Sequence, residues 1–218
     1  SRKALAIREN ALGLNHSDVA ETLNNLAFML YTQGSLVEAR PIWERCLAIW
    51  EKNLGPDSST VSTALNNLAS LLRNQGSYIE ARSLYERSLA IAEKIYGPDH
   101  SIVGSGLNNL AQLLVSQGSY SEARLLCERS LAISEKNLGP EHPNVANALY
   151  SFAKLLNKQG FYAEASSFYK RAQVIWEKSF GPKHPYVAYT LEGLASILRD
   201  QGSYAEARLL YEQALMIC

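Results

Sequence analysis

Histidine and cysteine are the side chains of this chain that could bind a metal or attack a substrate. The four histidines, His16, His100, His142 and His184, recur at one position of a repeating pattern, which Ser58 fills once. Zinc holds its ligands at about 2 Å, whereas equivalent atoms on neighbouring packed helices are about 8–10 Å apart. We therefore predict no shared metal ion, and we expect the histidines to pack or to cap the helix that follows.

The three cysteines, Cys46, Cys127 and Cys218, occupy three different positions of the same pattern. A cysteine nucleophile needs a histidine partner in space, and the histidines belong to another part of the pattern. Cys46 and Cys127 are therefore interpreted as small buried hydrophobic residues. An odd number of cysteines without paired spacing favours a reducing compartment, so we expect a cytoplasmic location. No catalytic residue and no cofactor is predicted.

The charge of the chain is balanced, with 21 lysine plus arginine residues against 21 aspartate plus glutamate residues. Such a balance provides no global field to attract nucleic acid or anionic lipid. The hydrophobic fraction of 47% is ordinary for a globular chain. No apolar run approaches the roughly 20 residues that cross a bilayer. We predict neither nucleic-acid binding nor membrane insertion.

Glycine recurs with a period of 42 residues in two series. They are Gly13, Gly55, Gly97, Gly139 and Gly181, and Gly34, Gly76, Gly118, Gly160 and Gly202. Glutamine precedes every glycine of the second series, and Glu-Ala begins four residues after it. Internal repeats of this length are typical of stacked supersecondary units.

Each of these glycines is expected to end a helix. The Gln-Gly pair supplies the left-handed residue that closes a helix C-terminus, and the other glycine, usually followed by proline, ends the next helix. Ser35 to Glu38 matches a capping box, in which serine and glutamate bond orphan amides at a helix start. The box recurs from Ser77, Ser119 and Ser203. Phe161 replaces the serine in the fourth repeat, so that helix is expected to start less cleanly.

Both segments between the glycines have helical periodicity. Leu23, Leu26 and Leu30 form one apolar face of a first helix, whereas the second helix carries two adjacent apolar stripes. A helix that is apolar on two sides must be covered on two sides, which a hairpin stacked between other hairpins achieves. The sequence therefore predicts an all-α fold. Its core is expected to contain Trp43, Trp50 and Trp176.

The repeat resembles the tetratricopeptide repeat (TPR). The first repeat has matching residues at the signature positions of that family: Leu23, Leu26, Ala27, Leu30, Gly34, Leu36, Ala39, Trp43 and Cys46. The usual TPR period is about 34 residues. The longer period here, with Leu-Asn-Asn-Leu-Ala, Glu-Ala-Arg and Gly-Pro-x-His-Pro segments, is similar to the kinesin light chain type. The resemblance implies a right-handed α-α superhelix (solenoid) of antiparallel helix hairpins, with about 11 helices.

A single TPR solenoid is expected over residues 1–218. Residues 1–12 match the second helix of a truncated repeat, and residues 181–218 match a truncated last repeat. The full repeats between them are 13–54, 55–96, 97–138 and 139–180. Solenoid ends normally carry polar caps, and neither end matches one. We therefore expect a part of a longer array, whose uncapped ends offer surfaces for end-to-end self-association.

The resemblance also implies where a partner binds, because first helices line the concave groove in this family. The groove begins with three asparagine pairs: Asn24 and Asn25, Asn66 and Asn67, and Asn108 and Asn109. Asparagine is a weak helix former, and its amide both donates and accepts hydrogen bonds. A ladder of these amides can therefore pair with an extended peptide backbone. Alternatively, one asparagine of each pair hydrogen-bonds within the stack.

Further along the first helices, the groove side chains become more varied. They are Phe28, Tyr31, Arg73, Gln112, Tyr150, Lys154, Lys158, Tyr189 and Arg199. The last two repeats replace the asparagine pairs with Tyr150-Ser151 and Glu192-Gly193. The basic side chains can pair with acidic residues of a ligand, although Glu192 makes this bias mild.

Gly104 and Gly106 lie within a predicted first helix and belong to no phosphate-binding loop pattern. Either that helix starts late, or the groove there admits a close backbone approach. The sequence leaves both explanations open.

Together these features indicate a non-enzymatic scaffold or adaptor that binds a peptide or protein segment along the concave groove. The alternative is a self-associating structural or autoregulatory repeat segment of a larger signalling protein. An enzyme is the weakest interpretation, because no acid–base pair, nucleophile or phosphate loop stands out from the repeat.

Overall fold

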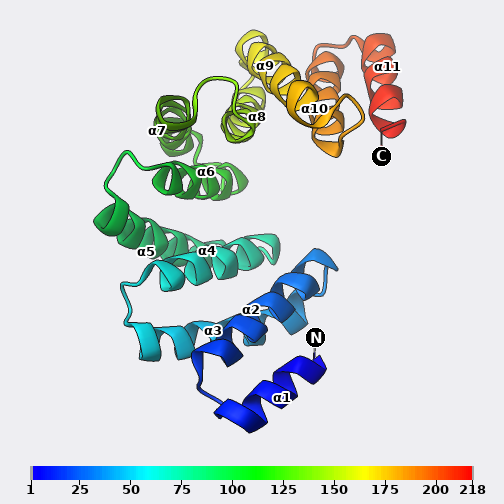
Figure 1. Ribbon diagram of the computed structural model, residues 1–218. Helices are drawn as coiled ribbons and strands as arrows, with labels where there is room; N and C mark the ends of the chain where they lie inside the picture. Colours follow the sequence, from blue (N-terminus) through cyan, green and yellow to red (C-terminus); the bar gives the residue numbers. More distant parts are fainter. Residues whose placement is uncertain (1, 218) are drawn as a thin grey trace. The chain divides into compact units, whose positions relative to one another are not determined.

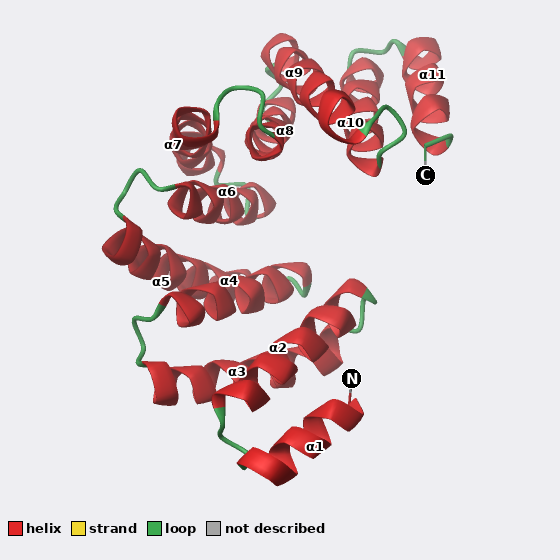
Figure 2. Cartoon of the chain, in the orientation of Figure 1, coloured by secondary structure: helices red, strands yellow, loops and turns green. Residues whose placement is uncertain are grey.

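The computed structural model describes residues 2–217, and within this range it contains eleven α-helices and no strand (Figure 1, Figure 2). In chain order the helices are α1 (Arg2–Leu12), α2 (Ser17–Thr32), α3 (Leu36–Leu54), α4 (Ser59–Asn74), α5 (Tyr78–Tyr96), α6 (Ser101–Ser116), α7 (Tyr120–Leu138), α8 (Pro143–Lys158), α9 (Tyr162–Phe180), α10 (Pro185–Asp200) and α11 (Tyr204–Leu215). Each loop between them contains one of the recurrent glycines. The predicted all-α fold is confirmed.

The chain divides into two compact units, and the boundary between Leu113 and Leu114 lies within α6. In the first unit, α2 packs on α3 and α4 packs on α5, while α1 contacts α2 and α3 contacts α4. In the second unit, α8 packs on α9 and α10 packs on α11, while α7 contacts α8 and α9 contacts α10. Each unit is therefore a stack of helical hairpins, as expected for a solenoid.

The turn that closes each first helix has one geometry throughout. Gly34 has a φ of +77°, its N–H donates to the Tyr31 carbonyl at 3.0 Å, and Ser35 N–H donates to the Leu30 carbonyl at 2.9 Å. This bond pair is the Schellman motif, in which a left-handed residue satisfies the last carbonyls of a helix. It recurs at Gly76, Gly118, Gly160 and Gly202. The predicted role of the Gln-Gly pair is confirmed.

The predicted capping boxes are wrong in their serine contact. The serine side chains make no capping hydrogen bond at the four positions Ser35, Ser77, Ser119 and Ser203. The backbone of the turn engages nearby amides instead, because Ser35 N–H donates to the Leu30 carbonyl and Leu36 N–H to the Gly34 carbonyl, both at 2.9 Å. The tight turn therefore starts the second helix without help from the serine hydroxyl.

Phe161 does not disturb the start of α9, contrary to the expectation from the sequence. Its backbone angles of −79° and 61° match those of the serine at Ser35, and α9 begins at Tyr162 in the register of the other second helices. The Phe161 ring lies 5.7 Å from the guanidinium carbon of Arg124. Because no hydroxyl is needed for the turn, a phenylalanine is tolerated there.

Side-chain caps occur instead at the start of the first helices, where histidine recurs. The Nδ1 atom of each histidine accepts a hydrogen bond from the backbone N–H two residues later, at 3.2, 3.2, 3.1 and 3.3 Å for His16, His100, His142 and His184. Ser58 caps α4 with its hydroxyl, which accepts from Val61 N–H three residues later at 3.3 Å. The expected capping role of the histidines is confirmed.

The core of each unit lies where a second helix packs between two first helices, α3 between α2 and α4 and α9 between α8 and α10. In the first unit it includes Val19, Leu23, Cys46, Trp50, Val61 and Leu65. In the second unit it includes Val145, Leu149, Ala172, Trp176, Val187 and Leu191. The three tryptophans Trp43, Trp50 and Trp176 are buried, as predicted.

The two glycines of α6 do not delay the start of that helix. It begins at Ser101, the same repeat position as Ser59 in α4, so the late-start explanation is wrong. A Cβ atom added at Gly106 would lie 3.4 Å from Leu89 Cδ1, so the α6 backbone runs close to the side chains of α5.

Removal of a histidine cap is expected to destabilise the fold. His142→Ala should lower the free energy of unfolding by about 1 kcal/mol, because Asn144 N–H loses its acceptor. His142→Ser should retain most of the stability, since Ser58 caps α4 with its hydroxyl. Chemical denaturation of the three proteins checks this, and an alanine variant as stable as the parent would contradict the capping role.

Candidate functional site

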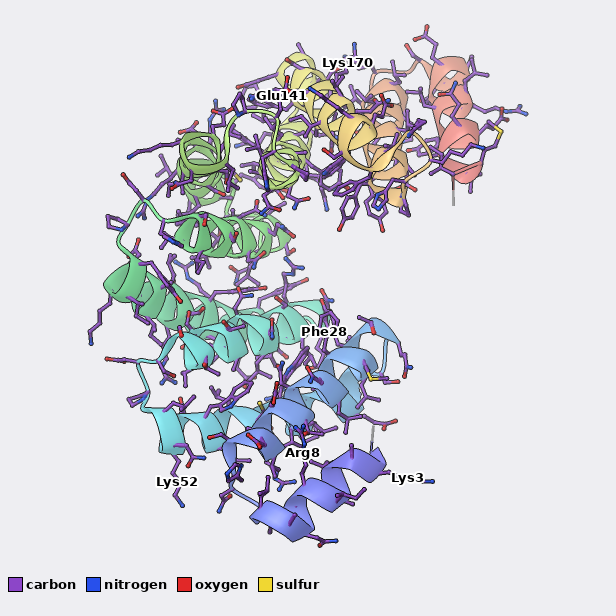
Figure 3. The ribbon with its side chains drawn as sticks, viewed as in Figure 1. Lys3, Arg8, Phe28, Lys52, Glu141 and Lys170 are labelled. Carbon is purple, nitrogen blue, oxygen red and sulfur yellow. The ribbon has the colours of Figure 1, made fainter. Side chains whose placement is uncertain are left out.

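The candidate groove consists of the first-helix side chains that the sequence assigns to the concave face, and it is described separately for the two units. In the first unit they lie on α2, α4 and α6: Asn24, Asn25, Phe28, Tyr31, Asn66, Asn67, Arg73, Asn108, Asn109 and Gln112. In the second unit they lie on α8 and α10: Tyr150, Lys154, Lys158, Tyr189 and Arg199. All are half-buried or exposed, and Phe28, which is labelled in Figure 3, is 55% exposed.

Several groove asparagines hydrogen-bond within the stack. Asn24 Oδ1 accepts from Trp43 Nε1 at 2.9 Å, which ties α2 to α3. Asn109 Nδ2 donates to Asn66 Oδ1 at 3.0 Å, which ties α6 to α4. Asn108 Oδ1 is enclosed and has no hydrogen-bond partner among the described residues. The amides of Asn24, Asn66 and Asn109 therefore help to hold neighbouring helices in register.

Two further polar contacts join successive first helices along the groove. Arg73 Nη1 on α4 donates to Gln112 Oε1 on α6 at 2.9 Å. Asn74 Nδ2 on α4 donates to the Tyr31 hydroxyl on α2 at 2.9 Å. Because a glutamine carbonyl is neutral, the Arg73 charge is oriented but not neutralised by this contact.

The groove of the second unit is built on aromatic rings. The Tyr150 ring centroid lies 5.6 Å from that of Trp176, 5.7 Å from Tyr169 and 6.4 Å from Tyr189, and Lys154 Nζ lies 5.7 Å from the Tyr150 ring. Burial raises the pKa of Tyr150 to about 12, with the Glu192 charge adding to the effect. The phenol therefore stays neutral near pH 7, and this part of the groove presents aromatic surface.

The basic groove residues of the second unit differ in their surroundings. Arg199 donates to Asp200 Oδ1 at 2.9 and 3.0 Å and to Ser196 Oγ at 3.1 Å, so its charge is largely compensated. Lys158 is exposed on α8. Attraction of acidic ligand residues, which stays a prediction, would therefore depend on the lysines rather than on Arg199.

A cavity of about 150 Å³ lies in the first unit between α4, α5 and α6. Asn66 and Asn109 are among its lining residues, and so are Ser62, Leu89, Ala92, Ile102 and Gly106. Ala92 holds the repeat position that is filled by Trp50 in α3 and by Trp176 in α9. The cavity thus lies where two other repeats carry an indole ring.

This cavity was not predicted from the sequence. Its signals were the small residues Ala92 and Gly106. The Ala92 position holds tryptophan or serine in the other full repeats, and the Gly106 position holds alanine or threonine. Gly106 lines the cavity from α6, whereas Ala92 lines it from α5, a different helix. Only the packing of α6 on α5 brings the two positions together.

Cys46 and Cys127 are buried thiols. Cys46 is fully buried and its thiol donates to the Ala20 carbonyl at 3.1 Å. Burial raises the pKa of both Cys46 and Cys127 to about 12. The interpretation of these two residues as small buried hydrophobic groups is confirmed, and Cys218 lies outside the described residues.

Residues 2–217 contain neither a metal-binding cluster nor a helix that could span a membrane. In that range no three histidine, cysteine or acidic side chains gather closely enough to hold a metal ion. None of the described helices combines the length and the apolar character that crossing a bilayer requires.

The repeat geometry agrees with a comparison of the sequence with protein families. The family model of the tetratricopeptide repeat matches residues 18–71, 60–136, 104–172 and 145–218. The chain belongs to the tetratricopeptide repeat family. TPR repeats generally mediate protein–protein interactions, so protein binding is the general role of this fold. A search of curated proteins found no match.

Solved structures similar to this TPR chain include kinesin light chain-like repeats. One is of nearly identical TPR-like repeats from a Podosopora anserina protein assigned as a kinesin light chain, with 26% identity, a TM-score of 0.71, and 93% of this chain and 96% of that chain covered. Another is BtubC (BKLC) from P. vanneervenii, with 18% identity, a TM-score of 0.76, and 99% and 85% covered. A third is Pseudomonas aeruginosa pilF, with 19% identity, a TM-score of 0.62, and 93% and 78% covered. The last two show the TPR fold alone.

Gly193 of the candidate groove is explained by packing of this TPR chain. A Cβ atom there would lie 2.5 Å from Tyr169 Cζ and 2.6 Å from Cε1, inside the tyrosine ring's own volume. One repeat earlier, the corresponding residues are Ser151 and Cys127, so a side chain on the first helix there meets no tyrosine ring.

Gly193→Ala is therefore expected to destabilise the fold by about 1–3 kcal/mol, as overpacking usually does. In a Tyr169→Cys background the same change should cost less or even stabilise, because alanine is the better helix former by about 1 kcal/mol. A double-mutant cycle by chemical denaturation measures the coupling. Equal effects of Gly193→Ala in both backgrounds would show that the Tyr169 ring is not the reason for the glycine.

Proposed function

We propose that this TPR chain is a non-catalytic scaffold that binds an extended or short helical segment of another protein along the candidate groove. The observation that carries the proposal is the cavity of about 150 Å³ that Asn66 and Asn109 line. A cavity of about this volume accommodates a benzene-sized group. An apolar side chain of the ligand would enter it, with its polar main chain beside the two amides.

The residues around the cavity are suited both to holding an apolar side chain and to hydrogen-bonding a peptide main chain. Leu89, Ala92 and Ile102 offer apolar surface to a side chain. Asn66 and Asn109 already share one hydrogen bond, and each amide keeps further donor or acceptor capacity for a peptide backbone. Many small polar contacts of this kind favour modest affinity, because the ordering of groove side chains opposes binding.

In the second unit, we expect the candidate groove to contact an aromatic or acidic residue of the ligand. Tyr189 is 42% exposed beside Tyr150, so its ring face is accessible for stacking. Lys154 and Lys158 are exposed on α8 and supply positive charge. A ligand with an acidic residue would gain charge-assisted hydrogen bonds from them. A cytoplasmic location likewise stays a prediction.

A peptide array probed with the whole chain, followed by titration of a selected peptide, tests the proposal. Asn67→Ala and Asn109→Ala are each expected to weaken binding about five- to tenfold, the effect of losing one hydrogen bond. Ala92→Trp should weaken it more, because an indole then occupies the cavity as at Trp50 and Trp176. Binding unchanged by all three substitutions would contradict the groove assignment.

A matched control for the cavity substitution is Ala90→Trp. Ala90 lies on the same helix, α5, but is exposed and does not line the cavity. It should leave peptide affinity unchanged. Melting temperatures of all variants separate a local effect on binding from loss of the fold.

A second candidate function is self-association, as expected for a structural or autoregulatory segment of a larger signalling protein. It is favoured by the apolar surface of α11 and the residue after it, where Leu209, Leu215 and Met216 are 59%, 75% and 79% exposed. Light scattering at several concentrations should then show a mass that rises with concentration. Leu209→Glu should abolish the rise in mass. A strictly monomeric unsubstituted protein would exclude this function.

A further inference from the structure

An ion pair recurs near the start of the second helices, on a face that does not belong to the candidate groove. An arginine and a glutamate four residues later pair along the helix, with N–O distances of 2.7, 2.7, 3.0 and 2.7 Å. The pairs are Arg40 with Glu44, Arg82 with Glu86, Arg124 with Glu128, and Arg208 with Glu212. Surface pairs of this spacing contribute little stability singly, so their geometry matters more than their energy.

The same arginine also reaches the second helix of the following repeat. In the first unit, Arg40 Nη2 lies 2.8 and 3.1 Å from the two carboxylate oxygens of Glu80. In the second unit, Arg124 Nη2 lies 3.7 Å from Glu164 Oε1, and its guanidinium carbon lies 5.9 Å from the ring of Phe152. The arginine therefore fills the space between two second helices, over a side chain of the first helix between them.

The fourth repeat departs from this pattern at both members of the pair. Ser166 stands at the arginine position and Lys170 at the glutamate position of α9, where Figure 3 labels Lys170. Glu206 of α11 is retained at the position of Glu80 and Glu164. Within the described part of the chain, no basic side chain pairs with the Glu206 carboxylate.

A cavity of about 330 Å³ lies at this place between α9, α10 and α11. Its lining includes Ser166, Lys170, Leu194, Ile197, Glu206 and Leu210. Leu194 is the repeat counterpart of Phe152, and Glu206 is the counterpart of Glu164. Two of the groups beside the Arg124 side chain, Phe152 and Glu164, thus have apolar and acidic counterparts around this cavity, while the arginine itself is replaced by a serine.

We propose that this cavity binds an arginine side chain of a partner protein. The arginine stem would lie on Leu194, Ile197 and Leu210, and the guanidinium would donate to the Glu206 carboxylate. Arginine suits such a site because its planar guanidinium pairs with carboxylates while its stem packs on apolar surface. Lys170 has the opposite charge to the glutamate it replaces, so the partner is expected to carry an acidic residue close to that arginine.

This second interaction surface is separate from the proposed groove, because no groove residue lines the cavity. Peptide binding in the candidate groove and arginine binding in this cavity can therefore be tested and rejected independently.

In the experiment, Nα-acetyl-arginine amide is titrated into the whole chain, whose isoleucine and leucine methyl groups are isotope-labelled. The methyl signals are followed by NMR. Shifts are expected at the methyl groups of Leu194, Ile197 and Leu210, with an affinity near the millimolar range typical of so small a ligand. Nα-acetyl-citrulline amide, which has nearly the same shape without the charge, should bind at least about tenfold more weakly. Equal binding of citrulline amide, or shifts that do not include these methyl groups, would overturn the proposal.

Three variants make the test independent of that comparison. Glu206→Gln should weaken arginine amide about tenfold. Lys170→Glu should strengthen it severalfold, because it removes a like charge and supplies the second carboxylate that Glu128 offers Arg124. Ser166→Arg combined with Lys170→Glu restores the repeat pattern and should abolish binding, because the internal arginine then occupies the cavity. A Lys170→Glu variant that binds no better than the parent protein would contradict the proposed site.

Discussion

The left-handed glycine after each first helix is the constraint on which the hairpins of both units depend. Its positive φ lets two backbone bonds close the helix, as Ser35 and Gly34 do with the carbonyls of Leu30 and Tyr31. A residue with a Cβ atom would pay about 1–2 kcal/mol for the same backbone conformation. Because this turn is the same in every repeat, equivalent side chains enter equivalent surroundings within each unit.

Because of that regularity, a difference between two repeats at one position adds or removes a side chain in otherwise similar surroundings. Ala92 in place of a tryptophan removes an indole, and a cavity lies beside the groove asparagines. Ser166 in place of an arginine removes a guanidinium, and a second cavity lies beside Glu206. The converse is seen at Gly193, where the ring of Tyr169 occupies the volume that a side chain would need. The repeats thus build the scaffold, and their differences shape the surfaces that can bind a partner.

The local features were predicted best from the sequence. Helix boundaries, glycine turns, histidine caps and buried tryptophans follow from periodicity and from the conformational preferences of single residues. The capping boxes failed because the motif assumes that the serine side chain is required, whereas the turn at Gly34 already bonds the amides of Ser35 and Leu36 to the carbonyls of Leu30 and Gly34. Phe161 is tolerated for the same reason.

The sequence by itself determined the all-α class, the hairpin unit and the repeat position of every residue. Those properties depend on glycine φ, helix periodicity and the separation of apolar from polar faces, which are all encoded locally. Only the tertiary structure decided that Asn24 bonds Trp43, that Asn109 bonds Asn66, and that a cavity opens beside Ala92. Those outcomes depend on side chains from different helices meeting in space, so the volume and the hydrogen bonds at each contact are settled jointly by residues far apart in the chain.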